Sequence, residues 1–268
     1  RLGGSLAEQQ AAVGSLRQLS RWSEARRSMV EAGGVAALVE AARSRDLDGH
    51  ARREASLAVA QLACAPHAEA VACAGGAEVL IEAMRRDGGG AVAGAAAGAL
   101  GVLVETASGR SALLRDGVGV VVQLLQGGRE GGVVGDALHV LQRLAEAPEG
   151  QAALGEAGAP TAVLPLCHDD TLAISAARLL DSLQLDRASC HAVAEAGGVP
   201  TLSALLDHSR PETRRHGLGA LARLCSQLPS GAVPAEAIGS VAACCEADAE
   251  PRAREDAAAV LVQLAASA

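Results

Sequence analysis

The feature that most constrains this chain is a short phrase that recurs at a nearly constant interval. It reads EAGGVAALVEAA at 31–42 and CAGGAEVLIEAM at 73–84, and four further versions begin at 115, 156, 195 and 235. The register of the six phrases is marked by Gly33, Gly75, Gly117, Gly158, Gly197 and Ile238. Successive positions are 42, 42, 41, 39 and 41 residues apart. Self-similarity at a fixed period predicts tandem structural units.

A second landmark runs in step with the first. An apolar-periodic helical pattern ends at a leucine between the phrases, at Leu19, Leu62, Leu103, Leu144, Leu183, Leu224 and Leu264. The intervals are 43, 41, 41, 39, 41 and 40 residues. Two independent landmarks thus give a period near 41 residues. Helical solenoid repeats have periods of about 40–47 residues, so an array of helices is predicted.

The stretch 67–107 shows how one unit is built. HAEAVACAGG predicts a short helix that ends at glycine, because glycine adopts the left-handed conformation of a sharp stop. AEVLIEAMRR predicts a second helix, DGGG a loop, and AVAGAAAGALGVLVETA a long third helix that is largely buried. Gly94, Gly98 and Gly101 lie inside this third helix, where each costs about 1 kcal/mol relative to alanine. We therefore expect this unit to be locally soft.

Prolines fall within the predicted second helices of two other units. Pro160 and Pro200 fall at the start of a predicted second helix, where a missing N–H costs nothing. Pro165 falls inside one and is predicted to kink or end it. The chain has no Phe and no Tyr, so the core must be built from Leu, Val and Ala. Each unit is expected to bury its apolar faces against its neighbours.

Charge and composition limit the classes of partner. The formal net charge is −8, which argues against a general nucleic-acid binder, since such proteins neutralise phosphates with a basic face. Trp22 is the single Trp, so stacking platforms for bases are missing, and we expect its ring to pack beneath the end of the array. No apolar run approaches the roughly 20 residues of a membrane span. We expect neither nucleic acid nor membrane as a partner.

Cysteine usage bears on the compartment. The seven cysteines are an odd number without framework spacing: Cys64, Cys73, Cys167, Cys190, Cys225, Cys244 and Cys245. Most lie in apolar helical patterns, where cysteine acts as a small hydrophobic residue. A reducing, intracellular and therefore cytoplasmic location is predicted, with a cilium or the cytoskeleton as a narrower alternative. Because the chain begins at Arg1, we also expect it to be part of a longer protein.

No motif predicts chemistry. Glycine-rich strings occur without the preceding strand that a phosphate-binding loop requires. CHDD at 167–170 and CH at 190–191 place metal-capable side chains together, but no CxxC or HxxxH pair accompanies them. We expect no catalytic residue, no cofactor, no metal site and no enzymatic activity.

These units resemble the armadillo repeat family. The resemblance lies in second-helix phrases such as EAGGVPTLSALL at 195–206 and in third helices such as REASLAVAQLACAP at 53–66 and RRHGLGALARLCSQ at 214–227. It implies an all-α fold, a right-handed α-solenoid (superhelix) of about six three-helix units plus a leading helix. It also implies one armadillo-repeat domain over 1–268, with units near 1–22 (partial), 23–66, 67–107, 108–148, 149–186, 187–227 and 228–268. In this family the third helices line the concave face.

Peptide-binding members of the family carry ladders of Asn and, in importin-type receptors, Trp on their third helices. Here the positions matching Asn hold Gln18, Gln61, Val102, Arg143, Ser182, Arg223 and Gln263. The positions matching Trp hold Gly14, Leu57, Gly98, His139, Arg178, Gly219 and Ala259. Codon bias explains a lack of Asn but not of Trp, since Trp22 is present. Both ladders are missing, which argues against an importin-type receptor for basic signals.

Other side chains take the place of the ladders. The candidate protein-binding residues are Gln18, Gln61, His139, Arg143, Arg178, Arg215 and Arg223. Arginine binds carboxylates with two parallel hydrogen bonds, so an acidic or mixed segment of another protein is the predicted partner. The competing interpretation is that these arginines are solvated or paired with neighbours such as Asp181 or Glu146.

Three function classes follow. The first is a noncatalytic scaffold or adaptor that binds a partner segment, including a subunit of a cytoskeletal or axonemal assembly. The second is an armadillo-like nucleotide-exchange factor that clamps a heat-shock chaperone. The third is an enzyme built on helical repeats, but the nearest such architecture has a period closer to thirty, which steps of 39 to 43 contradict. The oligomeric state is left open.

Overall fold

The structure, a computed structural model, describes residues 5–127, 131–228, 239–242 and 251–265. Within these ranges the regular elements are helices and no β-strand occurs, so the all-α prediction is confirmed. The chain forms two compact units, residues 1–144 and 145–268, which we describe separately as unit 1 and unit 2. No described helix combines the length and the apolar character needed to cross a membrane.

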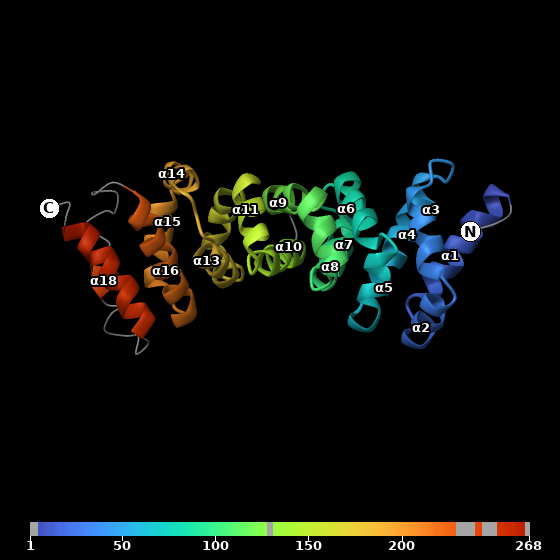
Figure 1. Cartoon of the computed structure of the whole chain (residues 1–268), viewed down its shortest axis with the longest axis horizontal. Coiled ribbons are helices and arrows are strands. Elements are labelled where there is room, and N and C mark those ends of the chain that lie inside the picture. Colours follow the sequence, from blue (N-terminus) through green and yellow to red (C-terminus); the bar gives the residue numbers. More distant parts are fainter. Residues whose placement is uncertain (1–4, 128–130, 229–238, 243–250, 266–268) are drawn as a thin grey trace. The chain divides into compact units, whose positions relative to one another are not determined.

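Unit 1 contains the predicted succession of first, second and third helices (Figure 1). Its first helices are α2 (Ser23–Glu31), α5 (Ala68–Cys73) and α8 (Ala107–Ala112). Its second helices are α3 (Gly34–Arg43), α6 (Gly76–Asp87) and α9 (Val118–Gly127). Its third helices are α1 (Leu6–Leu19), α4 (Gly49–Leu62), α7 (Ala91–Leu103) and α10 (Gly131–Leu144). The short elements η1 (Ala65–His67) and η2 (Leu113–Gly117) precede α5 and follow α8.

Unit 2 repeats the same order. The first helices are α11 (Pro148–Glu156) and α14 (Arg187–Glu195), and the second helices are α12 (Ala159–Val163) and α15 (Gly198–Ala204). These second helices continue into the 3-10 turns η3 (Leu164–His168) and η4 (Leu205–Asp207). The third helices are α13 (Ala173–Ser182), α16 (Pro211–Gln227) and α18 (Pro251–Ala265). Of the sixth phrase, only 239–242 lies within the described residues.

The recurring glycine turns the chain from a first helix into a second helix. Gly33, Gly75, Gly158 and Gly197 have φ between +69° and +86°, the left-handed region in which a side chain is strained. The glycine that follows is needed for another reason. A Cβ on Gly76 would lie 2.7 Å from the carbonyl oxygen of Val71, because the second helix starts against the end of the first. The predicted helix stops are confirmed at these four positions.

Gly117 departs from this pattern. We expected the same sharp stop, but Gly117 has no positive φ and instead ends the π-helical turn η2, through which α8 continues into α9. The phrase here places Val118 where Gly34, Gly76 and Gly198 stand. Alanine is tolerated at the same place, as Ala159 shows, whereas valine carries two further methyl groups on Cβ. The wider π-helical turn η2 lets the Val118 side chain be buried without the close approach of the second helix to the end of the first.

The core of each unit consists of the predicted small aliphatic side chains. The landmark leucines from Leu62 to Leu224 are buried, whereas Leu19 on the leading helix is 46% exposed. Pro165 ends α12 as predicted, since the chain passes into η3 at Leu164. Pro160 and Pro200 lie in the first turns of α12 and α15, also as predicted.

The glycines of α7 make room for the neighbouring third helix. Added Cβ atoms at Gly94, Gly98 and Gly101 would lie 2.9, 3.3 and 3.1 Å from side-chain atoms of α10. These atoms belong to Val133, Asp136 and His139. The low helix propensity of glycine is therefore offset by close packing of α10 on α7.

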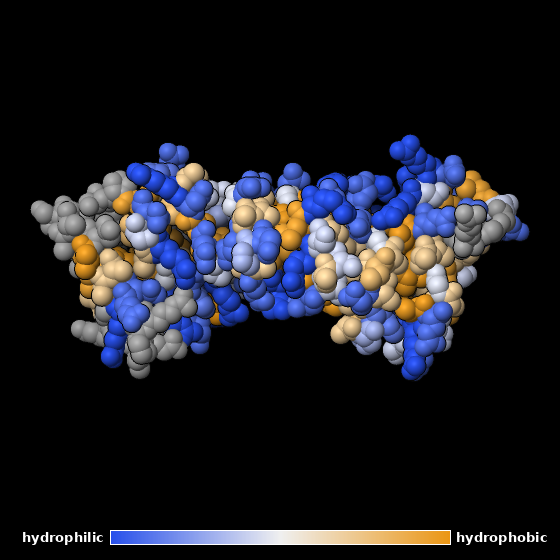
Figure 2. Space-filling model, in the orientation of Figure 1, coloured by the Kyte–Doolittle hydropathy of each residue, from blue (hydrophilic) through white to orange (hydrophobic). Residues whose placement is uncertain are grey.

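Trp22 corrects one expectation. Its side chain is 66% exposed and does not pack beneath the end of the array. Trp22 is the N-cap residue of α2 with an extended backbone, so it lies in the α1–α2 connection, where no described helix covers it. Leu6 and Leu19, at the two ends of α1, are also exposed. Figure 2 shows apolar side chains at the surface of the N-terminal end of unit 1.

Candidate functional site

The third helices pack against one another in each unit. In unit 1, α4 contacts α1 and α7, and α10 contacts α7. In unit 2, α16 contacts both α13 and α18. We call these rows the third-helix face of each unit. All seven candidate residues lie on third helices: Gln18, Gln61, His139 and Arg143 in unit 1, and Arg178, Arg215 and Arg223 in unit 2.

Gln61 joins α4 to α1. Its Oε1 accepts hydrogen bonds from Arg17 Nη1 and from Ser20 Oγ, each at 2.6 Å. Ser20 is fully buried, which fixes the amide between the two helices. Gln18 is exposed, and its Oε1 lies 3.5 Å from Arg21 Nη1. The oxygen of Gln61 is therefore used within the protein, while Gln18 stands at the surface.

Arg143 is neutralised by a carboxylate of the preceding repeat. Its Nε and Nη2 donate to the two carboxylate oxygens of Glu105, which follows the end of α7. This two-pronged hydrogen bond holds the pKa of Glu105 below its usual value. The nearby His139 is exposed and lies against Gly101. Pairing with a neighbouring carboxylate, that of Glu105, is thus the observed state of Arg143.

A buried carboxylate organises the third-helix face of unit 2. Asp181 is 6% exposed. Its Oδ2 lies 2.9 Å from His216 Nδ1, and its Oδ1 accepts a hydrogen bond of 3.3 Å from Arg223 Nη2. Gly219 makes this arrangement possible, because a Cβ there would overlap Asp181 Oδ1. Arg223 is therefore held by Asp181, as the competing interpretation anticipated.

Arg178 differs from the other candidates. It lies on α13 and is exposed. Within the described part of the chain its guanidinium has no hydrogen bond or ion pair, whereas Arg215 is half-buried and has a partner. Of the arginines predicted to bind a partner segment, Arg178 is the one with all its donors available to an incoming acidic group.

The structure places the metal-capable string CHDD at the end of η3 and in the turn that follows it. Among the described residues no three His, Cys, Asp or Glu side chains are arranged to hold an ion. Cys167 is buried, and burial raises the pKa of its thiol to about 12. The carboxylate of Asp169 is occupied by the turn that it caps, because it accepts hydrogen bonds from Thr171 N at 2.8 Å and from the Thr171 hydroxyl. CHDD is therefore a loop with a buried thiol.

Sequence reasoning missed a basic pocket in unit 1. It lies between α4, α6 and α7, has a volume of about 220 Å³ and is lined by Arg52, Arg53 and Arg86. These arginines precede the ladder positions and belong to two different repeats, so neither ladder pointed to them. Two pairs of adjacent arginines, at 52–53 and at 85–86, could have indicated this pocket, because each pair lies at a predicted end of a helix.

Comparison with known proteins gives structural neighbours. No protein-family model matches the chain, and no curated protein sequence matches it. An engineered protein of known structure is 27% identical, with a TM-score of 0.64, over 84% of this chain and 93% of its own. A computationally designed armadillo repeat protein for modular peptide recognition is 22% identical, with a TM-score of 0.67, over 82% and 94%. A designed armadillo repeat protein in complex with the peptide (KR)4 is also 22% identical, with a TM-score of 0.63, over 83% and 95%.

Proposed function

The chain has an armadillo-like repeat fold, and we propose that it is a noncatalytic scaffold whose third-helix face binds an extended segment of another protein. Solenoids present a long surface made of equivalent positions, which suits a ligand that is itself extended. Two of the structural neighbours are designed armadillo repeat proteins, one described as made for peptide recognition and one solved with a peptide. Their use of this fold supports the same use here.

The partner segment is proposed to be acidic or mixed in charge. The observation that carries this is Arg178, an exposed arginine on the third-helix face with no ion pair among the described residues. A guanidinium binds a carboxylate with two parallel hydrogen bonds, which fixes both position and orientation. Other arginines of the third-helix faces are engaged within their own unit, Arg143 with Glu105 in unit 1 and Arg223 with Asp181 in unit 2.

Buried thiols support the noncatalytic part of the proposal. A nucleophilic cysteine needs a lowered pKa and access to solvent. Cys167, Cys190 and Cys225 have the opposite properties, because burial raises the pKa of each thiol, to about 12 at Cys167 and about 11 at Cys225.

A charge reversal tests the binding face. Peptides are first selected from a library of acidic and mixed-charge sequences, and their affinities for the wild type and for Arg178→Glu are then measured by titration calorimetry. We expect the dissociation constant to rise by about tenfold or more, because a carboxylate that repels the acidic peptide replaces the guanidinium that binds it. Arg187→Glu is the matched control, since Arg187 is also exposed in unit 2 but begins the first helix α14. Equal loss in both variants, or no selectable peptide, contradicts the proposal.

A further inference from the structure

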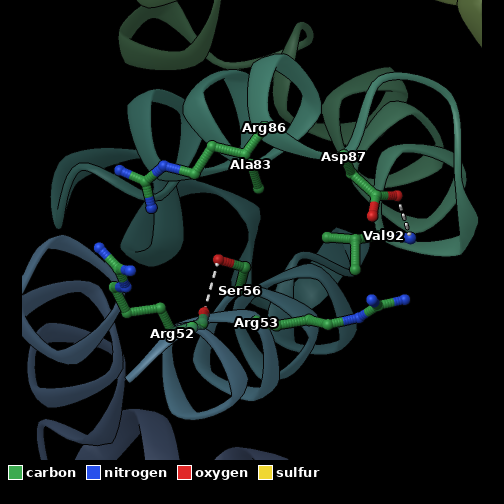
Figure 3. A pocket seen from close by; sticks show the side chains of 8 residues that line it. Arg52, Arg53, Ser56, Ala83, Arg86, Asp87 and Val92 are labelled. Atoms are coloured by element: carbon green, nitrogen blue, oxygen red, sulfur yellow. Dashed lines mark hydrogen bonds between the residues drawn. The ribbon is translucent and has the colours of Figure 1, made fainter. Parts of the chain in front are cut away.

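The basic pocket of unit 1 is lined by three arginines and by one carboxylate, that of Asp87. Arg52 and Arg53 lie near the start of α4, and Arg86 lies in the last turn of α6 (Figure 3). Asp87 also lines the pocket, but its carboxylate caps α7: Oδ2 accepts hydrogen bonds from Val92 N at 2.9 Å and from Ala93 N at 3.0 Å. That acid is therefore engaged with backbone donors.

The guanidinium groups of Arg52 and Arg86 share one side of the pocket. Figure 3 shows the two groups pointing toward each other, while Arg53 extends toward the opposite side. Arg86 Nε donates to Glu82 Oε1 at 3.0 Å, which leaves its two terminal nitrogens for another partner. Arg52 is half-buried, and its Nε is a buried donor with no hydrogen-bond partner among the described residues. An unpaired buried donor beside a second cation is costly unless an anion joins them.

The chemistry of the pocket favours a phosphate group. Ser56 is buried within the lining, where its hydroxyl donates to the carbonyl of Arg52 at 3.0 Å and can still accept a hydrogen bond. A phosphate monoester carries nearly two negative charges and three terminal oxygens, so it can engage two guanidinium forks at once. A carboxylate has one charge and two oxygens, and satisfies one fork. A volume of about 220 Å³ leaves room for the larger group.

We infer that the pocket of Arg52, Arg53 and Arg86 binds a phosphate monoester carried on a side chain of the partner segment. The source of the phosphate rests on the proposed function: α4 is a third helix, so its first turn borders the face along which the segment lies in unit 1. Phosphorylation of the partner then strengthens docking, because the new dianion meets the two facing guanidinium groups.

Small probes test the pocket without the partner. The full chain, labelled with ¹⁵N-arginine, is titrated at constant ionic strength with N-acetyl-phosphoserine methylamide, N-acetyl-aspartate methylamide and inorganic phosphate. We expect saturable shifts of the Arg52 and Arg86 Nε–Hε resonances and binding of the phosphoserine probe about tenfold tighter than the aspartate probe. Resonances that do not move, or equal affinity for phosphoserine and aspartate, overturn the inference. Equal affinity for inorganic phosphate overturns its assignment to a peptide side chain.

Pairs of substitutions distinguish binding in the pocket from general electrostatic attraction of the phosphate. The double variant Arg52→Gln, Arg86→Gln is expected to bind the phosphoserine probe about tenfold more weakly or worse. The double variant Arg27→Gln, Arg45→Gln removes the same charge from exposed positions of unit 1, and its affinity for the probe is expected to change by less than about twofold. An equal loss of affinity in the two double variants contradicts binding in the pocket. Should the first double variant not fold, Arg52→Lys with Arg86→Lys keeps both charges but removes the planar guanidinium groups. An unchanged affinity of this variant for the phosphoserine probe also contradicts binding in the pocket.

The two proposals fail separately. If Arg178→Glu leaves the binding of selected peptides unchanged while the phosphoserine probe still depends on Arg52 and Arg86, the pocket stands and the binding face is wrong. If Arg178→Glu weakens peptide binding while the probe does not bind, the binding face stands and the pocket assignment is wrong.

Discussion

The thiol of Cys167 illustrates how the environment of a single residue decides its chemistry. Next to His168, Asp169 and Asp170 it belongs to a string of metal-capable residues, yet its side chain lies in the core of unit 2. Ionisation would place a charge among aliphatic side chains, so burial raises its pKa to about 12. The hydroxyl and backbone of Thr171 occupy the carboxylate of Asp169. Residues that are close together in the sequence, such as Cys167 and Asp169, thus have different side-chain environments.

Thiol reactivity follows from burial. At about pH 8, where an ordinary cysteine is partly ionised, Cys73 is expected to react with iodoacetamide at least about tenfold faster than Cys167, Cys190 or Cys225. Cys73 is exposed on α5, whereas the other three thiols are buried. Peptide mass spectrometry of a time course measures each rate. Rapid alkylation of Cys167 in the folded protein would contradict the structure of the η3 segment.

The ion pair between Glu105 and Arg143 predicts a pH dependence. Because the pKa of Glu105 is lowered in the folded state, the pair stabilises the protein fully above the unfolded pKa of about 4.3 and loses this effect as the pH falls through the folded pKa. Both side chains are at least one-third exposed, so solvent screening limits the contribution to about 0.2–1 kcal/mol. Glu105→Gln should lower the free energy of unfolding by that amount near neutral pH, and by progressively less as the pH falls below the unfolded pKa of Glu105. Urea titrations near neutral pH and in acid measure this, and an equal loss under both conditions would contradict it.

At the scale of helices, the recurring phrase encodes the turn between the first and second helix of each repeat. Its first glycine supplies a left-handed backbone, and at the starts of α3, α6 and α15 a second glycine avoids a carbonyl oxygen of the preceding helix. Both needs are local, so the sequence alone predicted where α3, α6, α12 and α15 begin. The turn at Gly117 was predicted wrongly, because its shape depends on how Val118 is buried.

Two glycine-to-alanine variants separate backbone strain from helix propensity. Gly33→Ala places a side chain at φ +76° with open space around it, so the cost is conformational and about 1–2 kcal/mol. Gly14→Ala lies inside α1, also in open space, and should stabilise the protein by up to about 1 kcal/mol. Chemical denaturation compares both with the wild type. The same sign of change in the two variants would contradict the assigned turn.

Contacts between successive third helices lay beyond sequence reasoning. Glu105 pairs with Arg143, and Asp181 with Arg223, across about one repeat of sequence. Which acid meets which arginine depends on how the helices face one another, and glycines such as Gly219 set how closely they approach. The period predicts that equivalent residues share a face, but not which of them are neutralised there. The availability of Arg178 could therefore be found only in the structure.

At the scale of the whole chain, the repeat period and the phrase were sufficient to predict an armadillo-like repeat fold. Each unit stacks its helices as equivalent layers, and the aliphatic core needs no Phe or Tyr because Leu, Val and Ala fill the spaces between closely approaching helices. The division of the chain into a single domain and its seven predicted segments remains a prediction. So does the acidic character of the partner, which rests on side chains and not on the fold.

Hydrogen–deuterium exchange with and without a selected acidic peptide tests the central claim most directly. The account predicts slower exchange in the third helices α13 and α16, where the segment lies beside Arg178, and unchanged exchange in the first helices α11 and α14 of the same unit. Slower exchange confined to α11 and α14, or no change in any described helix at a saturating peptide concentration, would contradict the third-helix face as the binding surface.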